Sequence, residues 1–460
     1  MTRWADPVSV DRKATVSPEI VTILALVAIF AIATFLPINM GALAFVAAFV
    51  VGTLSVGLTT DEIIGGFPAG LVLTLIGVTY LFAIAQNNGT VDLLVRGAVR
   101  LVGGHVAAIP WIMFLVTAVL TAIGALSPAA VAIIAPIALT FAARHGISPL
   151  LMGMMVIHGA QGGGFSPISV YGVTVNTIVE DEGLPSSPLA VFLGALFFNL
   201  AIALVLFFVL GGRQLIGRKV AAEPLAHTEH AHGTVVRGHG AAPGPAVGGD
   251  DDEHVHPDVP QPVRFEQVVT LIGLVVVAVL ALVFDLDIGF VAITVAVVLA
   301  LFSAQQHKGA VTQISWSTIL LIAGVLTFVF VLQEAGTIDY VGDAVIGLGV
   351  PLVIALLLAY IGGVVSAFAS STAIIGVAIL LAVPFLESGA ISAVGVVVAL
   401  SVASTIVDVS PFSTNGALVL ANAQDVDRDR FYKQILAYSA IVVAAGPFLA
   451  WLVFVVPGWL

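Results

Sequence analysis

The sequence predicts an all-α polytopic membrane protein made of two similar halves. First, 60% of its 460 residues are hydrophobic and only 9% are charged, whereas soluble domains carry about 25% charge. Second, the apolar stretches are continuous, without the polar and apolar alternation of a membrane β-barrel. Third, the motif at 166–172 (SPISVYG) returns 244 residues later at 410–416 (SPFSTNG).

The composition also excludes several classes of protein. The chain has no cysteine, so it forms no disulfide and no cysteine-ligated metal site. Its 15 Lys and Arg residues are scattered, which argues against nucleic-acid binding. The net charge of −12 owes much to loop residues such as those at 250–253 (DDDE), so it says little about a ligand.

The first half follows a polar N-terminal tail at 1–17 and extends over 18–211. Its apolar runs near 19–36, 39–57, 67–86 and 188–210 each approach the roughly 20 residues that a spanning helix needs. A short amphipathic stretch begins near Gly89. The run at 106–142 is too long for one span and is interrupted at Ser127, so it predicts a re-entrant hairpin. The run at 147–178 contains the first Ser-Pro motif and predicts a broken helix.

A linker at 212–263 separates the halves. It is rich in Gly, Ala and Pro and contains six histidines, at 227, 230, 232, 239, 254 and 256. Their spacing fits no defined metal site. The composition favours a disordered, solvated linker, with weak metal binding as the alternative.

The second half, 264–460, repeats the plan. Spans are expected near 265–284, 288–304, 316–334 and 432–456, with a hairpin at 350–386 and a broken helix at 390–422. The segment at 333–339 (QEAGTID) also mirrors 86–92 (QNNGTVD), at an offset of 247. Landmarks in the same order at similar offsets indicate an internal repeat.

Each half is expected to have five crossings plus one re-entrant hairpin, which inverts the second half relative to the first. Lys and Arg concentrate on the cytoplasmic side of membrane proteins. Placing both termini outside puts twelve of the 15 basic residues on that side: Arg96, Arg100, Arg144, Arg213, Arg218, Lys219, Arg237, Arg264, Lys308, Arg428, Arg430 and Lys433. We therefore expect a multi-pass protein of the plasma (inner) membrane, with a cytoplasmic linker.

Polar side chains gather at the breaks. Broken helices direct backbone amides and carbonyls into the gap; amides suit carboxylates, and carbonyls and hydroxyls suit Na⁺. The candidate solute-binding residues are Ser127, Gln161, Gly163, Gly164, Ser166, Ser169, Ser371, Thr372, Ser410, Ser413, Thr414 and Asn415. The candidate residues for a coupling ion, Na⁺ or H⁺, are Ser127, Gly164, Ser370, Thr372 and Asp408. The alternative is that these hydroxyls only pack or satisfy the backbone.

Two ionisable residues lie in the apolar core. Asp408 is a candidate proton carrier or Na⁺ ligand, with a structural hydrogen bond to a helix end as its alternative. His158 is a weaker candidate, because a packed histidine explains it as well. A Ser/His/Asp hydrolase built from Ser166, His158 and Asp408 lacks an elbow motif, so no catalytic residue, no organic cofactor and no metal other than Na⁺ is expected.

The hairpins and Ser-Pro breaks resemble the divalent anion/Na⁺ symporters of the ion transporter superfamily. The segments at 162–169 (GGGFSPIS) and 408–416 (DVSPFSTNG) are most similar to MatC-type malonate and dicarboxylate carriers. The family's hairpin tips carry Ser-Asn-Thr, whereas the tips here read Ser127-Pro128-Ala129 and Ser370-Ser371-Thr372.

The resemblance implies a homodimer in the lipid bilayer, with a scaffold domain and a transport domain that moves as an elevator. It implies a symporter for small di- or tricarboxylates such as C4-dicarboxylates, malonate or citrate, driven by Na⁺ or H⁺. The alternative is a cation/proton or oxyanion exchanger of the same superfamily. Because the tips depart from the family pattern, Asp408-based proton coupling remains beside Na⁺ coupling.

Overall fold

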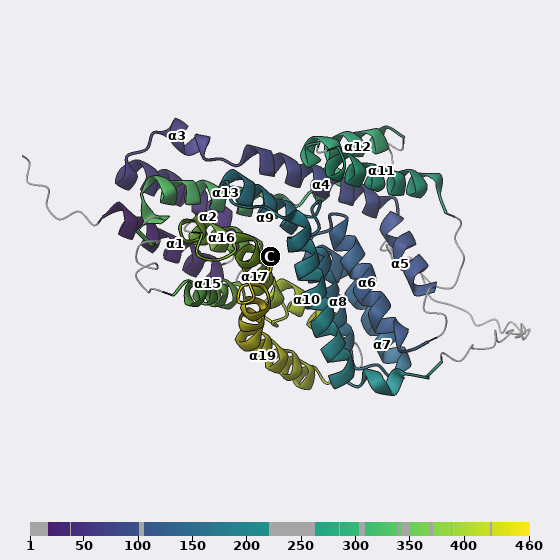
Figure 1. Ribbon diagram of the computed structural model, residues 1–460. Helices are drawn as coiled ribbons and strands as arrows, with labels where there is room; N and C mark the ends of the chain where they lie inside the picture. The colour runs from purple at the N-terminus through teal and green to yellow at the C-terminus, as the bar shows by residue number, and fades with distance from the viewer. Residues whose placement is uncertain are drawn as a thin grey trace, which may run out of the picture.

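The chain forms a bundle of helices, and the computed structural model contains no β-strand in the residues it describes (Figure 1). The described residues are 17–36, 38–100, 105–219, 263–284, 286–302, 309–338, 340–341, 350–367, 371–387, 389–423 and 426–460. The predicted tail at 1–17 and linker at 212–263 therefore lie largely outside the described residues.

The first half contains ten α-helices in its described part: α1(Pro18–Phe35), α2(Met40–Val51), α3(Thr60–Gly65), α4(Ala69–Asn87), α5(Thr90–Arg100), α6(Ala108–Ala122), α7(Ser127–His145), α8(Pro149–Gly163), α9(Val170–Asp181) and α10(Pro188–Val209). A π-helical turn at Gly52–Val56 extends α2. Proline stands in the first turn of α1, α7, α8 and α10, where its missing N–H costs nothing and its fixed φ suits a helix.

The second half contains α11(Phe265–Leu282), α12(Ile288–Phe302), α13(Trp316–Glu334), α15(Pro351–Ser366), α16(Ser371–Glu387), α17(Ala393–Ile406), α18(Thr414–Asn422) and α19(Arg428–Phe454). The contacting pair α15 and α16 precedes α17 and α18, as the contacting pair α6 and α7 precedes α8 and α9. Sequence analysis missed α3. The signal was present, because Thr59 followed three residues later by Glu62 is the pattern of a capping box, which the two residues form.

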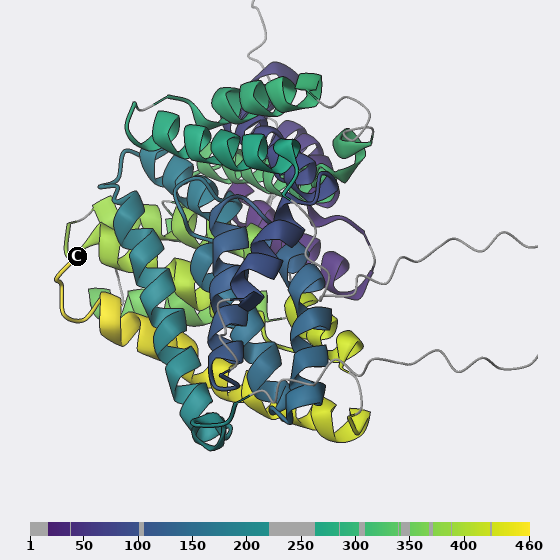
Figure 2. The ribbon, with the colours of Figure 1, turned by 90° about the vertical axis from the view of Figure 1, so that its right-hand side faces the viewer.

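The helices lie in two groups that Figures 1 and 2 show on opposite sides of the molecule. The first helix group contains α1, α2, α4, α11, α12 and α13, and the second contains α6, α7, α8, α10 and α15 to α19. Between the groups, α13 packs on α16, and α9 lies between them, in contact with α4 of the first group and with α16 of the second. A hydrogen bond from Gln333 to Glu182, 2.9 Å long, also joins them.

Glycine allows the closest helix crossings in both groups. A Cβ on Gly41 of α2 would lie 2.0 Å from the carbonyl oxygen of Leu320 on α13. In the second group, a Cβ on Gly163 of α8 would lie 1.9 Å from the carbonyl oxygen of Ala118 on α6. Small residues let backbones approach in this way inside membranes, where helices associate mainly by close packing.

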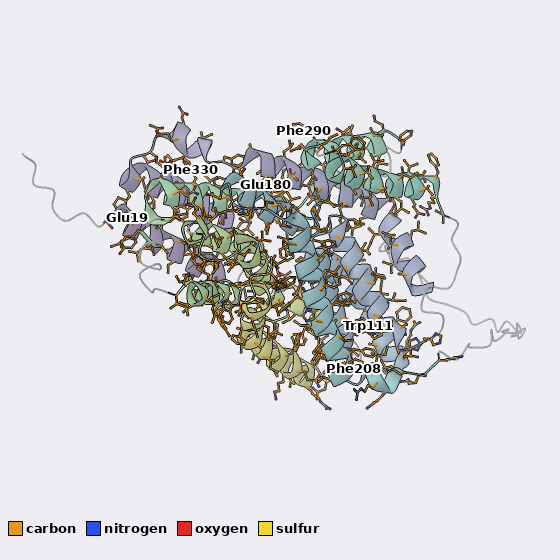
Figure 3. All side chains as sticks on the ribbon, in the orientation of Figure 1. Glu19, Trp111, Glu180, Phe208, Phe290 and Phe330 are labelled. Atoms are coloured by element: carbon orange, nitrogen blue, oxygen red, sulfur yellow. The ribbon has the colours of Figure 1, made fainter. Side chains whose placement is uncertain are left out.

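The outer surface is apolar. Five helices among the described residues, α4, α7, α10, α13 and α19, are long and apolar enough to cross a membrane. Figure 3 shows large apolar side chains such as Phe208 and Phe290 on the outside of the bundle. Phe290 is 64% exposed. Such side chains suit a hydrocarbon solvent, so the protein is a multi-pass membrane protein.

An apolar cavity of about 300 Å³ lies where the two groups meet. It is lined by α1 through Leu26, Val27 and Phe30, and by α15 and α16 through residues that include Ile361 and Ala378. A second apolar cavity of about 590 Å³ lies between α10 and α19. Neither cavity is lined by a charged side chain.

Candidate functional site

The two Ser-Pro motifs form matching turns between helices. Helix α8 ends at Gly163 and α9 begins at Val170; likewise α17 ends at Ile406 and α18 begins at Thr414. We call residues 164–172 the first break and residues 407–416 the second break, so that each includes the first turn of the helix that follows. Each turn interrupts a helix inside the apolar bundle.

The last serine of each turn caps the helix that follows. The hydroxyl of Ser169 accepts a hydrogen bond from the amide of Gly172, and that of Ser413 accepts one from Gly416, both at 3.4 Å. Each hydroxyl also donates to the carbonyl three residues earlier, on Ser166 or Ser410, at 2.7 Å. This is the ordinary chemistry of an N-cap. The structure therefore gives Ser169 and Ser413 a role in holding the turn.

The glycine three residues after each cap is required by the turn. A Cβ on Gly172 would lie 1.9 Å from the carbonyl oxygen of Ser166, and a Cβ on Gly416 would lie 2.0 Å from that of Ser410. No side chain fits at such distances. The two breaks therefore share one backbone design, from the sequence pattern S-P-x-S-x-x-G.

A polar cluster joins the second break to the start of α7. The amide nitrogen of Asn415 donates to the hydroxyl of Ser127 at 2.8 Å and to the carboxylate of Asp408 at 2.9 Å. All three residues are buried, and Asn415 is 0% exposed. The amide oxygen of Asn415 has no hydrogen-bond partner within the described residues. We call these three residues the Asp408 cluster.

The other candidates at the second break differ in exposure. The hydroxyl of Ser410 is buried and accepts a hydrogen bond from the amide of Phe412 at 3.0 Å. Thr414, by contrast, is exposed. Of these two residues, therefore, only Ser410 is buried in the bundle.

At the first break, Gln161 is 1% exposed, and neither atom of its amide group has a partner among the described residues. Gly163 packs on α6, and a Cβ on Gly164 would lie 3.0 Å from the ring of Tyr171. Ser166 is buried. The glycines thus serve helix packing as well as the turn.

At the second hairpin, the structure describes less of the predicted set. The hydroxyl of Ser366 donates to that of Ser371 at 2.9 Å, and both residues are buried. Ser370 and the side chain of Thr372 lie outside the described part of the chain.

His158 joins three helices of the second group. Its Nδ1 lies 2.8 Å from the amide oxygen of Asn199 on α10, and its Nε2 lies 2.6 Å from the hydroxyl of Tyr438 on α19. Asn199 donates its own amide to the carbonyl of Ala195, so its oxygen accepts from the Nδ1–H of His158. Sequence analysis missed Asn199, although a lone amide in the apolar run at 188–210 was the available signal.

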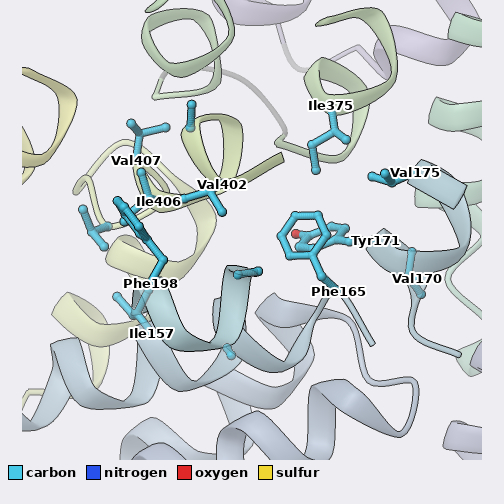
Figure 4. Close-up of a cluster of buried hydrophobic side chains, with 14 of the residues drawn as sticks. Ile157, Phe165, Val170, Tyr171, Val175, Phe198, Ile375, Val402, Ile406 and Val407 are labelled. Carbon is cyan, nitrogen blue, oxygen red and sulfur yellow. The ribbon is translucent and has the colours of Figure 1, made fainter. Parts of the chain in front are cut away.

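Apolar side chains surround the breaks. Figure 4 shows Phe165 and Tyr171 of the first break between Val402 of α17 on one side and Val175 of α9 on the other. The rings of Phe165 and Tyr171 stand 5.5 Å apart. Burial in such surroundings strengthens the electrostatic interactions of the few polar groups there.

The N-terminal third of the chain matches a known protein family. Residues 16–164 match the family model described as the N-terminus of the dicarboxylate carrier protein MatC. The resemblance to MatC-type carriers is confirmed over this segment. The match ends at Gly164, the first residue of the first break, and so includes Ser127 and Gln161.

The fold also has a relative among solved structures. The crystal structure of the Alcanivorax borkumensis YdaH transporter, described as having an unusual topology, aligns with a TM-score of 0.56 over 95% of this chain and 97% of that one. The sequences are 14% identical, so the likeness concerns the fold. The comparison with curated proteins found no match.

Proposed function

We propose that this protein carries small di- or tricarboxylates across the plasma (inner) membrane, as a symporter driven by Na⁺ or H⁺. The observation that carries the proposal is the Asp408 cluster, which joins the first hairpin to the second break inside an apolar bundle. The match of residues 16–164 to a dicarboxylate carrier family supports carboxylate as the cargo.

The proposed coupling follows from charge. An anionic solute beside the carboxylate of Asp408 is repelled, and this repulsion is strong where the dielectric constant is low. A proton or Na⁺ on Asp408 removes the repulsion, so solute and cation favour each other's binding. For Na⁺, the free amide oxygen of Asn415 and the hydroxyl of Ser127 supply further oxygen ligands of a suitable kind.

Helix ends would hold the carboxylates. The N-termini of α9 and α18 lie at the two breaks, and the positive dipole end of each helix favours an anion. The division into two helix groups supports an elevator, in which the second group moves against the first. By the same proposal the protein works as a homodimer of inverted repeats.

Counterflow in proteoliposomes tests the function. Labelled malonate, succinate and citrate are exchanged with and without Na⁺, and across a pH gradient. We expect uptake of at least one of them, with dependence on one cation. Absence of uptake of all three would reject carboxylate transport and favour the exchanger alternative.

A matched pair of asparagines on α18 tests the site. Asn415→Ala removes both hydrogen bonds of the Asp408 cluster and should raise the KM for solute or cation about tenfold. Asn422→Ala is the control, because the side chain of Asn422 bonds, among the described residues, only to the carbonyl of Leu418 one turn earlier. Equal effects of the two substitutions would remove the Asp408 cluster from the binding site.

A further inference from the structure

The side-chain amide of Gln161 is buried without hydrogen bonds to the described residues. Its side chain lies in the last turn of α8, directly before the first break, and is 1% exposed. Neither Nε2 nor Oε1 has a hydrogen-bond partner among the described residues. A buried amide without partners is costly, so each such group calls for an explanation.

The surroundings hold α8 firmly in place at this point. One turn earlier, His158 bonds to Asn199 on one side and Tyr438 on the other. On another face, Gly159 and Gly163 press against the backbone of α6. Rotation of α8 to find another partner for Gln161 would break these contacts. The position of Gln161 on α8 is therefore set by the fold.

Elsewhere the same chain satisfies a buried glutamine fully. Gln267 of α11 is 4% exposed, and its Oε1 accepts from the amide of Arg264 at 3.0 Å. Its Nε2 donates to the carbonyl oxygens of Asn88 and Gly89 at 3.4 and 3.1 Å. The contrast with Gln267 singles out Gln161 as a buried amide whose hydrogen-bonding groups are not used by the described residues.

The chemistry of an amide defines what that ligand must offer. Nε2 donates hydrogen bonds and Oε1 accepts them. An ionised carboxylate only accepts, so it would pair with Nε2 and leave Oε1 without a donor. The amide oxygen of Asn415 is a second buried acceptor without a partner. A hydroxyl group both donates and accepts, and it suits these acceptors.

We propose that Gln161 binds a hydroxyl group of the solute, so that the cargo is a hydroxylated di- or tricarboxylate. This inference rests on the proposed function and narrows it to one substrate class. A site built to bind a hydroxyl discriminates strongly against an analogue that lacks it, because the buried polar groups are then left unpaired.

Paired solutes that differ by one hydroxyl test the inference. Uptake of malonate is compared with that of 2-hydroxymalonate, and uptake of succinate with that of malate, at about pH 8, where carboxyl groups are ionised. We expect the hydroxylated member of at least one pair to have a KM about tenfold lower or more. Gln161→Met keeps the length of the side chain without its hydrogen bonds and should bring the ratio close to one, because the hydroxylated solute binds more weakly.

Gln267→Met is the matched control. It should lower the melting temperature, because two helices lose hydrogen bonds, and leave the ratio of KM values unchanged. A wild-type ratio near one in both pairs overturns the inference, even if Gln161→Met fails to fold. If the wild-type ratio of KM values persists in Gln161→Met, the inference is overturned as well. Failure to transport any of these four solutes or citrate rejects the proposed function, whereas transport without discrimination rejects this inference alone.

Discussion

The two breaks have the same backbone and different side chains. Both are capped by a serine and both require a glycine three residues later. At the offset of 244, however, Gly164 corresponds to Asp408 and Tyr171 corresponds to Asn415. The first break contains a pair of aromatic rings, and the second contains the Asp408 cluster. The S-P-x-S-x-x-G motif therefore determines the backbone of the turn. The residues at its variable positions and next to it determine which polar groups are present.

The comparison also shows that the two breaks are not independent. Ser127, from the first half, bonds to Asn415 of the second break. Gln161 adds a free amide at the end of α8. Both halves therefore contribute polar groups, although most of the charge and hydrogen-bonding capacity lies at the second break.

The largest expected effect, on ion-driven uptake, comes from Asp408, whose corresponding residue at the first break is a glycine. Asp408→Asn removes the charge that would carry the proton or ligate Na⁺. We expect uptake driven by an imposed ion gradient to fall by more than about tenfold, the order of one lost charged hydrogen bond. The control is Asp429→Asn, an exposed carboxylate in the first turn of α19. If gradient-driven uptake survives in Asp408→Asn, the proposed coupling at the second break is wrong.

A smaller effect is expected from the glycines that both breaks share. Gly172→Ala and Gly416→Ala each force a methyl group against a carbonyl oxygen. Overpacking of this kind costs about 1–3 kcal/mol or more, so both variants should melt at lower temperature in detergent, and to a similar extent. Gly65→Ala is the control, because a Cβ there meets open space. A large difference between the two variants would show that the backbones of the breaks are not equivalent.

The smallest effects should come from the capping serines. Ser169→Ala and Ser413→Ala each remove one N-cap, at a cost of about 1 kcal/mol. We expect lower melting temperatures with little change in KM, because each hydroxyl bonds to backbone groups of its own turn. An increase in KM of about tenfold in either variant would instead support the direct contact with solute that the sequence pattern predicts.

The sequence predicts the position of both breaks, because proline and serine interrupt apolar runs of spanning length. It does not predict which polar residues meet. Ser127 and Asn415 are 288 residues apart, and His158 and Tyr438 are 280 apart, so these pairs depend on how helices of different halves pack. The capping role of Ser169 and Ser413 was available in the sequence, since a serine that precedes a helix start is a common N-cap.

The apolar cavity of about 300 Å³ between α1 and the α15–α16 pair has a mechanical consequence. Helices whose side chains interdigitate resist sliding, since the close-packed atoms must separate first. Atoms that line a cavity lack contacts on one side, so this part of the interface offers less resistance to shear. Filling the cavity, for example with Ala378→Leu, would add friction between the two helix groups without touching a polar residue of either break.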